Sequence, residues 1–182
     1  MKKISPRFVI DSNSPPPQAI VGSIEILNQG YEFLEGLNHD DYVYIAQPHI
    51  SSSIGEHYRH WLDLFHAIRR DSDKVDYNVR RRGHEVERNM DIAKAEIAQL
   101  IEWLFGLPAN ALPQSVQVET EVMLSHTQIE EVTSTLVREI TFAALHATHH
   151  FAMAKVVASL RGLEADGRFG VAPATATYHR AQ

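Results

Sequence analysis

The stretch STLVREITFAALHATHHFAMAKVVASL, residues 134–160, places three of the chain's eleven histidines within five positions, among small and apolar residues. Ser134 is a suitable N-cap, so the stretch predicts one long helix over 134–160. Residues four apart lie on the same face of a helix, so His146 and His150 share a face and His149 lies about 60° to one side. The histidines on this face either pack in the core or bind a ligand through their ring nitrogens.

Three other segments also predict helices. Apolar residues recur at steps of four and three after Ile20, which is the spacing of one buried stripe. The serines at 51–53 offer N-caps for a further helix, and glycine and proline in GLPANALP, residues 106–113, end another. The predicted helices are 18–37, 51–70, 85–105 and 134–160.

One segment has a different period. In SVQVETEVML, residues 115–124, Val116, Val118, Thr120, Val122 and Leu124 alternate with mainly polar residues, which is typical of a half-buried strand. We therefore expect a hairpin near 115–133. The expected fold class is all-α: a four-helix bundle with a small β-hairpin between helices three and four. We expect one domain over 1–182, with an N-terminal extension at 1–17 and an irregular tail at 162–182.

Composition excludes several classes of function. A net charge of −6 and a pI near 6.0 argue against a nucleic-acid partner. Without cysteine the chain has no disulfide, thiolate ligand or cysteine nucleophile. The most apolar stretch, 140–160, is interrupted by histidines and a lysine, so no membrane partner is expected. The N-terminus lacks an apolar run, which favours a cytoplasmic protein.

A histidine pair four residues apart is a poor metal site by itself and needs a third ligand. The segment SIGEHYRHWLDLFH, residues 53–66, supplies His57 and His60, three positions apart. If this helix packs beside the last one, a histidine from each can meet in the core, as in other helix-bundle metal sites. Spacing alone leaves open whether these histidines bind metal or only pack.

Four segments in this order resemble the DinB/YfiT-like superfamily: SSIGEHYRHWLDLF (52–65), VDYNVRRRG (75–83), STLVREITFAALHATHHFAMA (134–154) and FGVAPAT (169–175). The resemblance covers roughly residues 18–175. It implies a four-helix bundle and a metal site with one histidine from the second helix and an H-x-x-x-H pair from the last. On this sequence, those positions are His60, His146 and His150. His57 and His149 are extra, as second-shell or packing residues, and His57 is the replacement for His60 if the register differs.

Three neutral imidazole ligands leave a divalent ion with its full positive charge and with an open coordination position, which is typical of catalytic metal sites. Imidazole does not select the metal, and the resemblance implies Ni, Zn, Fe or Mn. It also implies a metal-dependent hydrolase or thiol S-transferase, acting on a small molecule that is anionic or a low-molecular-weight thiol. The alternatives are a non-catalytic metal-binding or stress-related protein, and an interaction scaffold whose histidines only pack. A homodimer stays open.

The sequence identifies no catalytic residue outright, and two carboxylates are candidates. Glu139 faces the same way as His146 and is placed to orient a ligand or a water at the edge of the site; the alternative is an exposed residue or an ion pair with Arg138. Asp63 is placed to accept an N–H from a ligand histidine. Arg80, Arg81 and Arg82 form either a solvated face or an attractor for an anionic substrate. The remaining histidines are expected on the surface: His39, His49, His66, His84, His126 and His179.

The tail FGVAPATATY, residues 169–178, carries apolar anchors in Phe169, Val171 and Tyr178. Pro173 suits an extended run without helix. We therefore expect this tail to be ordered against the helices.

Overall fold

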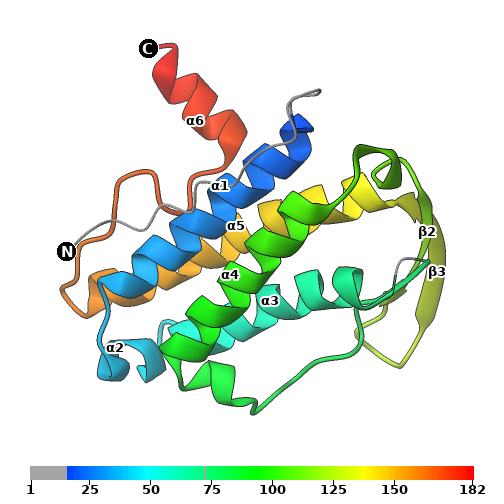
Figure 1. Ribbon diagram of the computed structural model, residues 1–182. Coiled ribbons are helices and arrows are strands. Elements are labelled where there is room, and N and C mark those ends of the chain that lie inside the picture. Colours follow the sequence, from blue (N-terminus) through cyan, green and yellow to red (C-terminus); the bar gives the residue numbers. More distant parts are fainter. Residues whose placement is uncertain (1–15, 72) are drawn as a thin grey trace.

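The computed structural model describes residues 16–71 and 73–182, so most of the expected extension 1–17 lies outside the described residues. Helix α5 packs against α1 and α3, and α4 packs against the same two helices (Figure 1). The predicted helices are confirmed, with the largest shift at the start of α4, which begins at Met90 instead of residue 85. Their bounds are α1 Gln18–Glu35, α3 Ile54–Arg70, α4 Met90–Gly106 and α5 Leu136–Leu160.

The expected all-α class is wrong, because the described residues form a mixed α/β structure with a three-stranded sheet. The predicted hairpin is present as β2 (Ser115–Glu121) and β3 (Ile129–Thr135), paired antiparallel. A third strand, β1 (Lys74–Asp76), pairs parallel to β2. Three residues are too few to show a period of two, so β1 left no pattern in the sequence.

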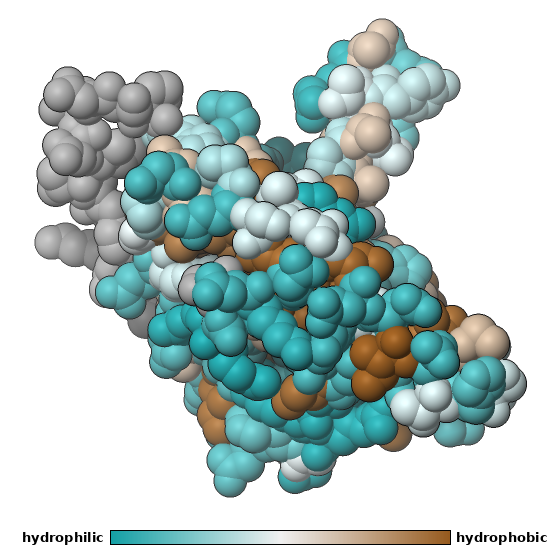
Figure 2. Space-filling view, turned by 90° about the vertical axis from the view of Figure 1, so that its right-hand side faces the viewer, coloured by the Kyte–Doolittle hydropathy of each residue, from teal (hydrophilic) through white to brown (hydrophobic). Residues whose placement is uncertain are grey.

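The sheet lies at one end of the long helices (Figure 1). Only the first half of the alternating stripe faces the core: Val116 and Val118 in β2 are buried, whereas Val122 and Leu124, which follow β2, are exposed. Figure 2 turns this end toward the viewer and shows a mainly hydrophilic surface with separate hydrophobic patches. None of the helices in the described part of the chain combines the length and apolar character needed to cross a bilayer.

Short helical elements lie between and after the long helices. Helix α2 (His39–Val43) follows Asn38, whose side chain and that of Asp41 form a reciprocal cap. A 3-10 turn, Glu85–Glu87, precedes α4, which Asn89 caps. A second 3-10 turn, Ala109–Ala111, follows α4. Thr135, not Ser134, caps α5.

The tail differs from its prediction after Phe169. Phe169 is buried and stacks on Phe33 and Phe151, with ring centroids 4.1 and 4.9 Å apart. Residues Pro173–Arg180 form α6, which points away from the long helices in Figure 1 and buries none of its side chains. The prediction of an extended run was wrong because Pro173 occupies the first turn of this helix, where a missing N–H does no harm. Tyr178 is 64% exposed, so it does not serve as the apolar anchor of the tail that we expected.

The start of α3 is held in place by its neighbours. Ser53 and Glu56 cap it reciprocally. Gly55 lies so close to the Glu87 carbonyl that a side chain there would overlap it. Farther along, Tyr58, Trp61 and Phe65 are fully buried. These contacts fix the rotation of α3, and therefore the direction of the half-buried histidines between the aromatic residues.

Candidate metal centre

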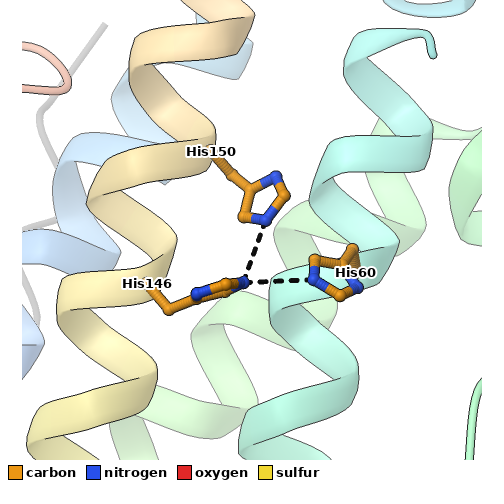
Figure 3. A group of neighbouring side chains, drawn as sticks. All are labelled: His60, His146 and His150. Atoms are coloured by element: carbon orange, nitrogen blue, oxygen red, sulfur yellow. Dashed lines mark hydrogen bonds between the residues drawn. The ribbon is translucent and has the colours of Figure 1, made fainter. Parts of the chain in front are cut away.

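Three histidines from α3 and α5 converge (Figure 3). Nε2 of His146 lies 3.1 Å from Nε2 of His60 and 3.0 Å from Nε2 of His150. One ligand atom from each of the three lies within 4.8 Å of the others. Two nitrogens that bind one zinc ion tetrahedrally, each at about 2.0–2.1 Å, are about 3.3 Å apart. The group therefore fits a metal ion after small adjustments, and it can hold one.

Burial keeps these imidazoles neutral. It is the largest cause that lowers the pKa of His60 to about 3, followed by the charge of Arg80 and by His146. Burial, and then His60, lowers the pKa of His150 to about 2, and burial also lowers the pKa of His146. Only a deprotonated imidazole nitrogen can bind a metal. Proton competition is thus expected well below the pH near 6.5 that an ordinary histidine would give.

The same shifts predict how the stability of the metal-free protein depends on pH. Folded His60 and His150 stay neutral, whereas in the unfolded chain they take up protons below about pH 6.5. Because the unfolded state then binds more protons, the free energy of unfolding falls as pH drops from 6.5 toward the lowered pKa values. We expect Tm to drop by on the order of 5 °C between pH 7 and pH 5. In a chain of this length, each kcal/mol lost from the free energy of unfolding lowers Tm by about 2–4 °C.

Thermal melts monitored by circular dichroism measure this effect, and His150→Gln should flatten the dependence. An unchanged Tm in the parent between pH 7 and 5 would contradict it.

His57 lies behind one of the three histidines. Its Nδ1 is 2.9 Å from Nδ1 of His150, the ring nitrogen that faces away from His146. If Nε2 of His150 binds a metal, its Nδ1 carries the proton and donates to His57. This contact fixes the orientation of the His150 ring, which is how a neighbouring residue supports a metal ligand. His149 is exposed, with its ring 5.6 Å from the His150 ring.

Within the described part of the chain, Asp63 hydrogen-bonds to Arg81 and not to a histidine, contrary to expectation. It accepts hydrogen bonds from the backbone N–H of Arg81 at 3.0 Å and from Nε of Arg81 at 2.5 Å. The Arg81 guanidinium also pairs with both oxygens of Glu96. Asp63 therefore anchors the loop after β1, and Arg81 is tied into the structure and cannot turn toward a substrate.

The arginine triplet does not act as a unit. Arg80 is half-buried, and its Nη1 lies 2.6 Å from Nδ1 of His60. Arg82 is exposed. Of the three arginines expected to attract a substrate, only Arg80 touches the histidine cluster. Chain spacing did not reveal this contact, because it depends on how the loop folds back over α3.

Glu139 is fully buried and already saturated with donors. It accepts hydrogen bonds from the Tyr77 hydroxyl at 2.7 Å, the Ser134 hydroxyl at 2.5 Å and Arg138 at 2.9 Å. The alternative of an ion pair with Arg138 is therefore present, and both carboxylate oxygens are occupied by donors rather than free to orient a ligand or a water. Glu139 instead joins the segments that follow β1 and end β3 to the first turns of α5.

A groove of about 600 Å³ runs along α5 beside the cluster. Its walls include His146, His149, Phe142 and Leu145. It offers an apolar surface that leads to one of the candidate ligands. Such a groove suits the apolar part of a small molecule.

One of the six histidines expected on the surface is not exposed. His66 is half-buried, and its Nε2 lies 2.8 Å from Glu96. The sequence around His66 gave no sign of this pairing, because Glu96 lies on another helix. The other five are exposed: His39, His49, His84, His126 and His179.

Comparisons with protein-family models, with curated proteins and with solved structures found no match to this chain.

Proposed function

We propose that this protein is a metal-dependent enzyme of the DinB/YfiT-like superfamily, of the hydrolase or thiol S-transferase type. The observation that carries the proposal is the convergence of three Nε2 atoms from His60, His146 and His150 beside a groove. These three neutral imidazoles would hold a divalent Ni, Zn, Fe or Mn ion, which would supply Lewis-acid chemistry to a substrate oxygen or sulfur.

The protein's own residues would divide the remaining work. His57 holds the ring of His150 through its far nitrogen. Phe142 and Leu145 offer the groove wall for the apolar part of a substrate. His149 also lines the groove, where its ring nitrogens can form a hydrogen bond with a polar group of the substrate.

The surroundings favour the transferase over the hydrolase. Across residues 16–71 and 73–182, no carboxylate hydrogen-bonds to the three histidines, and Asp63 and Glu139 are occupied by other donors. Water activation usually relies on such a base. A thiol substrate brings its own nucleophile, the thiolate, and so depends less on a carboxylate base of the protein. We therefore propose a small thiol and an electrophile as the substrates.

The test begins with the metal content of protein purified without a histidine tag. Turnover is then measured with the metal restored, on thiol–electrophile pairs and on a panel of esters and amides. We expect metal-dependent thiol conjugation that is lost in His150→Ala. Metal binding without turnover of either substrate class would instead indicate a non-catalytic metal-binding protein, and absence of metal binding would leave a packing role.

A further inference from the structure

The contact between Arg80 and His60 determines where the His60 proton lies. Nη1 of Arg80 is 2.6 Å from Nδ1 of His60. A guanidinium has only donors, so Nδ1 must accept this hydrogen bond. In a neutral imidazole the proton is then on the other nitrogen, Nε2.

Metal binding requires the opposite arrangement. Nε2 of His60 is the atom that faces Nε2 of His146 at 3.1 Å, and it must offer a lone pair to bind an ion. The proton of a neutral ring would then be on Nδ1, directly opposite the Arg80 donor. Two donors cannot share this short contact. The observed position of Arg80 and ligation by neutral His60 are therefore mutually exclusive.

Arg80 also lacks the counter-charge that its neighbours have. Arg59 pairs with Glu87 and Asp63, and Arg81 pairs with Asp63 and Glu96. Among the described residues, the ion pairs do not include the half-buried Arg80 guanidinium; the charge of Asp63 acts to raise the Arg80 pKa, but Asp63 itself pairs with Arg59 and Arg81. The backbone next to it is held by the hydrogen bond from Arg81 N–H to Asp63. The Arg80 side chain can therefore change rotamer while its loop stays in place.

We propose that Arg80 has two positions: on His60 in the metal-free protein, and released toward an anionic group of the bound molecule once an ion is held. The proposal rests on the metal site proposed above but not on any catalytic activity. A divalent ion with three neutral ligands leaves an excess of positive charge, to which Arg80 adds. The planar guanidinium can bind two carboxylate oxygens side by side. The site thus selects a small molecule with a carboxylate near its metal-binding atom.

The experiment uses the full chain loaded with cobalt(II), whose visible absorption reports its ligands. Chelator competition gives the cobalt affinity, and titration with acetate gives the anion affinity. Arg80→Gln should bind cobalt several-fold more tightly than the parent, because no cation opposes the His60 proton. Arg80→Gln should bind acetate about 10-fold more weakly than the parent, or more weakly still, because a charge-assisted pair is lost. The two effects thus have opposite signs.

The exposed neighbour Arg82 provides the matched control, because Arg82→Gln makes the same change in net charge. It should alter both affinities by less than about twofold, as expected for a screened surface charge. Arg80→Lys keeps the charge without the fork and should restore only part of the acetate affinity. Circular dichroism melts verify that all variants are folded.

Equal acetate affinity in Arg80→Gln and Arg82→Gln would overturn the proposal, as would weaker cobalt binding in Arg80→Gln. Failure of the parent to bind cobalt would refute the metal site itself. That result comes from the first titration, so the two failures are distinguishable.

Discussion

Replacing His150 with alanine is expected to weaken metal binding by more than about 100-fold. The change removes one of three nitrogens that converge within 4.8 Å, and changes in groups that only support a ligand already cost 10–100-fold. Alanine is the best helix former, so α5 should persist. Metal analysis of the purified protein, followed by competition with a chromogenic chelator, measures the effect.

Two further variants, at residues close to His150 in the structure, serve as comparisons. His149→Ala removes an exposed imidazole from the same helix and should keep metal affinity within a few-fold of the parent. His57→Ala removes the partner of His150 Nδ1 and should weaken binding by about 10–100-fold, the range for a supporting residue. If His150→Ala and His149→Ala both retain the parent's metal content, the three-histidine site is wrong and the histidines only pack.

Replacing Gly55 with alanine should destabilise the protein by about 3 kcal/mol or more, at the upper end for overpacking. The new Cβ would overlap the carbonyl oxygen of Glu87 and lie 2.8 Å from the Tyr42 ring. Backbone cannot rotate away as a flexible side chain does, so α3 or the 3-10 turn Glu85–Glu87 must shift. Thermal melts should show Tm lower by about 6 °C or more, at about 2–4 °C per kcal/mol.

Gly22→Ala is the matched control for this substitution. Gly22 lies inside α1, and a Cβ there meets nothing within 4 Å. Alanine should therefore stabilise the helix by about 0.5–1 kcal/mol, because glycine is the poorer helix former. A Gly55→Ala protein as stable as the parent would show that the contact between α3 and Glu87 is looser than the structure indicates.

Local periodicity determined the long helices and the hairpin. A stripe of apolar residues at helical spacing needs a partner surface whatever that surface is, so α1, α3, α4 and α5 were predictable without knowing their arrangement. The H-x-x-x-H pair is likewise local, because four residues along one helix always bring His146 and His150 to one face. The ends of the helices were less predictable, since caps such as Thr135 and Asn89 compete with equally suitable neighbours.

The fold class depended on tertiary structure. Strand β1 has three residues and is a strand only because Val75 lies opposite Val118 of β2. Helix α6 was missed for a different reason: Pro173 stops a helix that precedes it but starts one that follows.

Within the site, the sequence by itself determined the residue types and which histidines share a face. Tertiary structure decided which of them meet, because the rotation of α3 is set by Gly55 against Glu87 and by the buried aromatic residues. It also turned Asp63 and Glu139 away from the site, toward Arg81 and Tyr77. Carboxylates pair with whichever donors the packed chain brings within about 3 Å, and that proximity has no counterpart in local spacing. For the same physical reason, only the folded loop placed Arg80 on His60.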